Sequence, residues 1–138
     1  MRRAGLLAAC AFLAGCGGSK SDLPNKPPPA LSAQCGDVAE GIDAKPFWFR
    51  AKDKALLNGV AIGEGETAVV LAHGNPSQLC DWVPYAKELA ARGYLALAFD
   101  FRGLGNSRVQ FGQRAGRVDL DLEAASEQAR NGARTGSS

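Results

Sequence analysis

The sequence has no long hydrophobic run and almost no excess of charge of either sign. None of its apolar stretches reaches the roughly 18 to 20 residues that a helix needs to cross a bilayer, which excludes a polytopic membrane protein. There are 16 basic and 14 acidic residues, and Arg2 and Arg3 account for the net charge of +2, so nothing indicates a nucleic-acid partner. A chain of 138 residues has room for one domain only.

Histidine and aromatic residues are also scarce. His73 is the only histidine, and no second histidine or cysteine pair with ligand spacing accompanies it, so we expect no metal site and no cofactor. A hydrophobic fraction of 46% with 22% charged residues is the composition of a globular protein rather than a disordered one.

Residues 1–15 have the pattern of an export signal. Arg2 and Arg3 precede an apolar stretch over residues 4–14, which has the length of a signal-peptide core and is too short to span a membrane. We therefore expect residues 1–15 to be a signal peptide and leave them out of the fold.

The signal ends in Leu13-Ala14-Gly15-Cys16, which resembles the lipobox of bacterial lipoproteins. The resemblance implies a palmitate-type lipid anchor on Cys16, because several acyl chains on one residue hold a protein on a membrane stably. Gly17 in place of aspartate implies an outer-membrane location facing the periplasm. The alternative is an ordinary secretory signal with a chance cysteine.

Residues 16–34 have the composition of a tether. They hold Pro24 and three further prolines over residues 27–29, and no aromatic residue. Such a segment buries too little apolar surface to order itself, so we expect it to separate the domain, residues 35–138, from the membrane. The alternative is that these prolines bind a partner.

Two cysteines belong to the expected mature domain. If Cys10 is removed with the signal and Cys16 carries lipid, Cys35 and Cys80 remain. In an oxidising compartment this even pair forms either a disulfide or two buried thiols, and the sequence leaves both open.

The domain begins with patterns typical of β-strands. Residues 46–50 and 55–62 predict the two strands of a hairpin. Residues 67–72 are apolar on both faces, which predicts a buried central strand of a parallel sheet.

Helical patterns follow. Residues 82–92 carry apolar side chains at helical spacing, with Asp81 as the expected N-cap and Gly93 as the expected stop. Residues 94–99 predict another buried strand. Strand, helix and strand in this order predict a βαβ unit with parallel strands.

A second helix is predicted from Val118 to Arg130. Its apolar residues share one face, and its acidic residues lie in the first turns, where the helix dipole favours them. Asn131 and Gly132 are expected to end it.

Two loops carry the residue types of a reaction site. His73-Gly74-Asn75-Pro76 directly follows one predicted strand, and Asp100-Phe101-Arg102-Gly103-Leu104-Gly105-Asn106-Ser107 follows the next. A glycine at a strand end lets the backbone approach a ligand, and free N–H groups there can face a developing oxyanion.

The two motifs, with the helix and strand between them, resemble the N-terminal half of the α/β-hydrolase superfamily over residues 46–130. The resemblance implies an α/β fold with an incomplete sheet: an N-terminal hairpin, a βαβ unit and a further helix. It implies that His73, Gly74 and Asn75 form the oxyanion-hole loop, with the Asn75 N–H as donor and His73 packing the loop.

The second motif is implied to be structural. Asp100 and Arg102 would brace the loop, and Gly103 and Gly105 would permit its bend. For Arg102 an ion pair that braces the loop is favoured over substrate binding, and Ser107 is not expected to be a nucleophile.

The nucleophile of the family is missing from these residues. The family places it in G-x-S-x-G, and no such pentapeptide occurs; residues 105–109 fail at the last position. The single histidine already lies in the oxyanion loop, so the order serine, acid, histidine is not completed.

We interpret the chain as a truncated α/β-hydrolase lipoprotein related to serine esterases, inactive alone. One alternative is a non-catalytic envelope lipoprotein that binds a partner or small ligand. Another is an enzyme completed by a separately encoded C-terminal part. An incomplete sheet also exposes a strand edge, which favours self-association.

Overall fold

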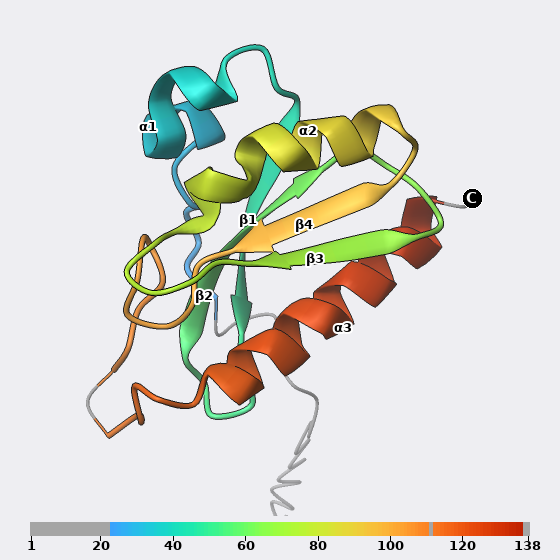
Figure 1. Cartoon of the computed structure of the whole chain (residues 1–138). Helices are drawn as coiled ribbons and strands as arrows, with labels where there is room; N and C mark the ends of the chain where they lie inside the picture. The colour runs from blue at the N-terminus through green and yellow to red at the C-terminus, as the bar shows by residue number, and fades with distance from the viewer. Residues whose placement is uncertain (1–22, 111, 137–138) are drawn as a thin grey trace, which may run out of the picture.

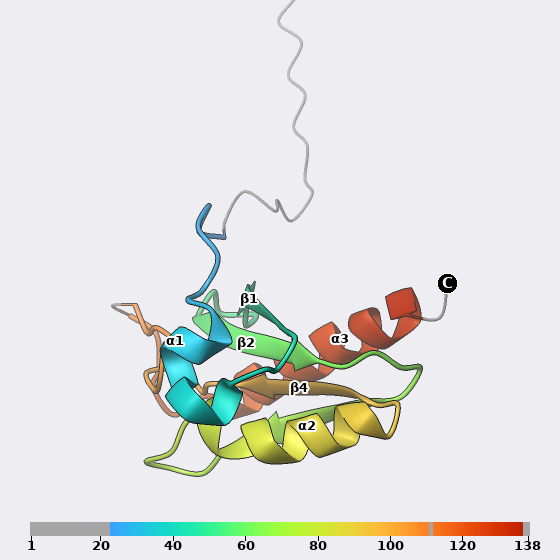
Figure 2. The same cartoon turned by 90° about the horizontal axis from the view of Figure 1, so that it is seen from above.

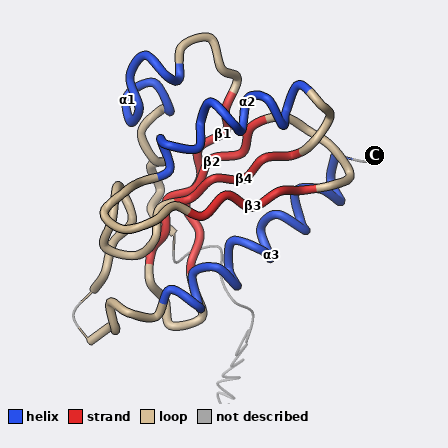
Figure 3. Tube along the Cα trace, viewed as in Figure 1, coloured by secondary structure: helices blue, strands red, loops and turns tan. Residues whose placement is uncertain are grey.

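A four-stranded mixed sheet lies between two layers of helices in the computed structural model, which describes residues 23–110 and 112–136 (Figures 1 and 3). The strand order is β1-β2-β4-β3. The strands are β1 (Ala44–Arg50), β2 (Leu56–Ile62), β3 (Ala68–Ala72) and β4 (Leu95–Phe99). The helices are α1 (Leu31–Cys35), α2 (Val83–Ala91) and α3 (Val118–Gly136), with 3₁₀ helices η2 (Gly36–Ala39) and η3 (Leu79–Trp82).

The strand pairing confirms the predicted hairpin and βαβ unit. β1 and β2 pair antiparallel, with Ala44 opposite Ile62. β3 and β4 pair parallel, because α2 carries the chain back across the sheet between them. β2 pairs antiparallel with β4, so the sheet is mixed and not purely parallel.

Apolar side chains form a core on each face of the sheet. On one face α1, η2 and α2 cover a cluster that includes Leu31, Val60 and Val83. On the other face α3 covers a cluster that includes Leu57 and Phe99 (Figure 2). β4 is buried along its whole length, since it lies inside the sheet with helices on both faces.

β3 differs from the prediction of a buried central strand. It lies at the edge of the described sheet and pairs only with β4. Four of its five residues are half-buried, although the strand is apolar on both faces. A run of apolar residues indicates that both faces of a strand are covered, but it does not indicate where the strand lies in the sheet. The prediction of a central position was therefore wrong.

α3 is longer than the sequence predicts. It continues through Asn131 and Gly132, the expected stop, to Gly136. A Cβ at Gly132 would lie 2.7 Å from Leu95 Cδ2, so this glycine serves close packing of the helix on β4. Ala133, one residue further, is buried against the same side of the sheet.

α2 begins after the expected N-cap. Asp81 lies within η3, and α2 starts at Val83 with no side-chain cap. The Asp81 carboxylate instead accepts a hydrogen bond from Ser77 Oγ in the preceding loop. The end of α2 is as predicted, since Gly93 has a φ of 85° directly after the C-cap Arg92.

The segment before β1 packs on the domain and so differs from the predicted tether. Residues 31–34 belong to α1, and Leu31 is buried. Trp48 Nε1 donates a hydrogen bond to Lys26 O at 2.9 Å. A disulfide joins Cys35 of α1 to Cys80 of η3, with Cα atoms 5.4 Å apart. Part of the proline-rich segment therefore covers the sheet.

The predicted signal peptide and Cys16 lie outside the described residues. In residues 23–110 and 112–136 no helix combines the length and the apolar composition needed to span a bilayer.

Candidate functional site

The loop after β3 begins at a buried histidine. His73 Nε2 accepts a hydrogen bond from the Phe101 N–H at 3.1 Å. Its Nδ1 lies 2.7 Å from Gly74 O and donates to it, because the lone pair of Nε2 is already used. The ring also packs edge-on against Phe101. His73 therefore ties the loop after β3 to the loop after β4, and its ring nitrogens are both engaged.

The other end of the same loop is held by Asp100, which is 1% exposed at the end of β4. Asp100 Oδ1 accepts a hydrogen bond from the Leu79 N–H at 2.8 Å, where η3 begins. Asp100 Oδ2 accepts from Asn58 Nδ2 at 2.8 Å and from the Asn106 N–H at 3.0 Å. The buried carboxylate thus fixes three segments at once.

Between these anchors the loop is exposed. The Ser77 N–H donates to Gly74 O at 3.0 Å and closes a turn that contains the cis Asn75–Pro76 peptide bond. In residues 23–110 and 112–136 Asn75 makes no hydrogen bond. No atom lies within 4 Å of the place of a Cβ at Gly74. The Asn75 N–H therefore stays available in a place that a ligand can approach.

Two residues of the loop after β4 pack against Asp100. A Cβ at Gly105 would lie 2.3 Å from Asp100 Oδ2, and the φ of Gly105 is 51°, so only glycine fits there. Ser107 Oγ donates to Asp100 O and accepts from the Asn58 N–H at 2.9 Å. Ser107 is 6% exposed and its hydroxyl is engaged on both sides, which suits a structural role and not that of a nucleophile.

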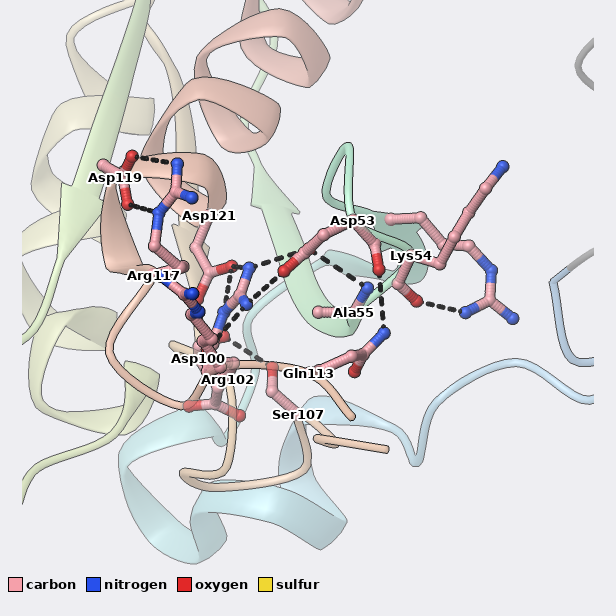
Figure 4. Close-up of polar contacts among 12 residues, drawn as sticks. Asp53, Lys54, Ala55, Asp100, Arg102, Ser107, Gln113, Arg117, Asp119 and Asp121 are labelled. Carbon is pink, nitrogen blue, oxygen red and sulfur yellow. Dashed lines mark hydrogen bonds and ion pairs between the residues drawn. The ribbon is translucent and has the colours of Figure 1, made fainter. Parts of the chain in front are cut away.

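Arg102 forms a buried ion cluster beside this loop (Figure 4). Its guanidinium makes hydrogen bonds to both Asp121 of α3 and Asp53 of the β1–β2 turn, the shortest at 2.6 Å. Burial disfavours the charge, but the hydrogen bonds that the guanidinium donates to the two carboxylates outweigh this effect and raise the pKa of Arg102 above its ordinary value. The hydrogen bond to Arg102 in turn lowers the pKa of Asp53.

Three participants in these networks carry no recognisable signal in the sequence. Asp53 and Asp121 look like ordinary polar residues of a turn and of a first helical turn, where acids are common. Gln34, from the segment expected to be a tether, accepts hydrogen bonds from Asn58 Nδ2 at 2.7 Å and Asn106 Nδ2 at 3.0 Å. None of them belongs to a motif, so only the folded arrangement identifies them.

Comparisons with known proteins agree with this architecture. No family model matches the sequence, and no curated protein matches it either. Among solved structures, an esterase from Pyrococcus furiosus superposes with a TM-score of 0.57 at 24% identity, over 78% of this chain and 42% of that one. An epoxide hydrolase from an endophytic Streptomyces superposes with a TM-score of 0.55 at 30% identity, over 64% of this chain and 27% of that one. An alpha/beta hydrolase from Sphaerobacter thermophilus superposes with a TM-score of 0.52 at 24% identity, over 59% of this chain and 31% of that one.

The described residues therefore have part of an α/β-hydrolase-like fold. The chain spans less than half the length of each of these hydrolases.

Proposed function

We propose that the chain contributes the oxyanion-binding, N-terminal part of a serine-type acyl hydrolase. One observation carries the proposal. The loop after β3 is held at both ends by buried hydrogen bonds, at His73 and Leu79, whereas the Asn75 N–H between them is left available in the described residues. The likeness of the fold to an esterase and to epoxide hydrolases supports it.

The chemistry of acyl transfer explains why such a loop would be useful. Attack on an ester carbonyl places negative charge on its oxygen, and a fixed N–H donor stabilises that charge without reorganising during the reaction. The His73 and Asp100 contacts fix the path of the chain around Asn75 before any substrate arrives. His73 is not the base in this proposal, because Nε2 already accepts from Phe101.

The nucleophile and its base would come from residues outside this sequence, since its 138 residues contain no G-x-S-x-G and one histidine. The coding DNA after Ser138, translated in all frames, is expected to encode a strand followed by that pentapeptide. Co-expressed with this chain, the encoded segment should co-purify with it and hydrolyse p-nitrophenyl butyrate.

This chain alone should not hydrolyse that ester. Turnover by the purified chain that a serine-directed fluorophosphonate abolishes would contradict the proposal. A downstream region without a G-x-S-x-G in any frame would also count against it.

We further propose that the protein is exported and lipid-anchored at Cys16. Labelling of cells with radioactive palmitate should mark the wild-type protein in the membrane fraction and leave Cys16→Ala unlabelled and released. Acylation of Cys16→Ala to the wild-type extent would contradict the lipobox interpretation.

A second candidate function is that of a non-catalytic envelope lipoprotein which binds a partner. The uncovered edge of β3 favours it, because such an edge presents backbone groups to another chain. Ester hydrolysis that depends on Asn75 would argue against this candidate.

A further inference from the structure

The short helix α1 is linked covalently to the loop after β3. Cys35 at the end of α1 is joined by the disulfide to Cys80, the residue that follows Leu79. The Leu79 N–H is the group that fixes this loop to the Asp100 carboxylate, at 2.8 Å. The disulfide therefore holds α1 directly beside an anchor of the loop.

The residue before this cysteine, Gln34, contacts the loop after β4 through its side chain. Gln34 Oε1 accepts hydrogen bonds from Asn58 Nδ2 at 2.7 Å and from Asn106 Nδ2 at 3.0 Å. Gln34 Nε2 donates to Pro29 O at 2.6 Å, which agrees with this orientation of the amide, because only its oxygen can accept from both asparagines. Both acceptor positions of the oxygen are then in use.

These hydrogen bonds form a closed ring with the Asp100 carboxylate. Asn58 Nδ2 donates one hydrogen to Gln34 Oε1 and the other to Asp100 Oδ2. Asn106 donates to Gln34 with its side chain and to Asp100 Oδ2 with its backbone N–H. Asn58 is 0% exposed, so loss of the Gln34 oxygen would leave one of its N–H groups without that acceptor, next to the carboxylate that fixes both loops.

We propose that Gln34 is a positioning residue for the loop that carries Asn75, and that the disulfide of α1 keeps Gln34 in place. Gln34 acts through Asp100, whose carboxylate also accepts from the Leu79 N–H at the end of that loop. The disulfide joins the neighbouring residue to η3, so it raises the effective concentration of the Gln34 amide at the two asparagines. The effect on catalysis rests on the proposed function, whereas the effect on the two loops does not.

Hydrogen exchange of the full chain tests the proposal without any hydrolysis. In Gln34→Ala the amides of Leu79 and Asn106 should exchange at least about tenfold faster, because both donate to the Asp100 carboxylate. The amides of β4, which is buried along its length, should change much less. Equal acceleration of all these amides would show a global loss of stability and overturn the proposal.

Two further variants separate the ring from its surroundings. Asn106→Ala deletes only one of the two hydrogen bonds that Gln34 accepts, so the same two amides should exchange faster than in the wild type but more slowly than in Gln34→Ala. Gln113→Ala is the matched control, because Gln113 is also half-buried and donates to another segment, at Asp53 O, but lies outside the ring. It should leave both amides unchanged, and acceleration equal to that in Gln34→Ala would overturn the proposal. So would an Asn106→Ala variant that exchanges like the wild type.

Dithiothreitol tests the part assigned to the disulfide. The dithiol gives two electrons and two protons to Cys35 and Cys80, which become thiols, and is itself oxidised to a disulfide. The reduced wild type should exchange the same two amides faster than the oxidised wild type. Gln34→Ala should then add much less than it does in the oxidised protein, because the ring is already weakened. Full additivity of the two changes would overturn the link between the disulfide and Gln34.

Kinetics test the consequence for catalysis. In the hydrolase assembled from this chain and the downstream segment, Gln34→Ala should lower kcat about tenfold and leave KM within about twofold, because the loop loses its position while the other contacts of the ester remain. An unchanged kcat would overturn the positioning role. Absence of hydrolysis by the assembled wild type would contradict the proposed function, and the exchange measurements would still decide whether Gln34 positions the loop.

Discussion

At the scale of single residues, Asp100 determines the geometry of the candidate site. Its two oxygens accept hydrogen bonds from Leu79, Asn58 and Asn106, which belong to three different segments. A buried carboxylate with such partners is stabilised in place, whereas loss of any partner would leave a buried charge less well satisfied. The loops after β3 and β4 therefore depend on each other.

Gly105 tests this dependence. Gly105→Ala should destabilise the fold more than Gly103→Ala, because both glycines have positive φ but only at Gly105 would a Cβ meet the Asp100 carboxylate, at 2.3 Å. At Gly103 the nearest atom would be Val109 Cγ2 at 3.4 Å. Urea unfolding of both variants measures the difference, and equal destabilisation would show that backbone strain alone matters.

The Arg102 cluster predicts a dependence on pH. Arg102 lowers the pKa of Asp53, so this carboxylate contributes stability that is complete above its unfolded pKa of about 4 and is lost as the pH falls through the lower folded value. Asp53→Asn should therefore lower the free energy of unfolding by about 1 to 3 kcal/mol at pH 7.

The difference between wild type and Asp53→Asn should shrink as the pH falls below about 4. Urea titrations at several pH values measure it, with the exposed pair of Lys45 and Glu64 as a control site. A difference that stays constant down to pH 2 would contradict the assignment of the effect to this carboxylate.

The motif residues could be singled out from the sequence because the two motifs, with the helix and strand between them, together resemble a known family. The structure places these motifs in two adjoining loops. Asp121 and Gln34 could not be predicted, since their partners, Arg102 and Asn106, are distant in the chain. Such partners are fixed by the packing of elements and not by local pattern.

At the scale of elements, hydrophobic patterns predicted which strands and helices exist but not where some of them end. α3 passes through Gly132 because close contact with Leu95 needs a residue without a side chain, and this outweighs the low helix propensity of glycine. α1 forms within a proline-rich segment because Leu31 is buried against the sheet. In both cases tertiary packing decides the outcome.

The disulfide between α1 and η3 should matter for stability. It closes a loop with a sequence separation of 45 residues, and such a link typically contributes about 2–4 kcal/mol. The free energy of unfolding of the double variant Cys35→Ser, Cys80→Ser should be lower by about this amount. That of the wild type should fall by the same amount in dithiothreitol.

Differential scanning calorimetry measures both losses. Dithiothreitol should leave the melting of the double variant unchanged, which provides the control. If reductant lowered the melting temperature of the double variant as much as that of the wild type, the effect would not come from this disulfide.

At the scale of the whole molecule, the described fold holds the loop after β3 in place at both ends and leaves the outer edge of β3 unpaired in the described sheet. The loop after β3 and the edge of β3 are adjacent, since the loop begins where the strand ends. A strand added on that edge would lie beside the loop.

The most direct test of the proposed function uses the backbone N–H of Asn75. In the hydrolase assembled from this chain and the downstream segment, Asn75→Pro removes that N–H, whereas Asn75→Ala removes only the side chain. The proposal predicts that Asn75→Pro lowers kcat for p-nitrophenyl butyrate about 10²–10³-fold and that Asn75→Ala leaves it nearly unchanged, with both variants melting like the wild type. Equal kcat values for the two variants would contradict it.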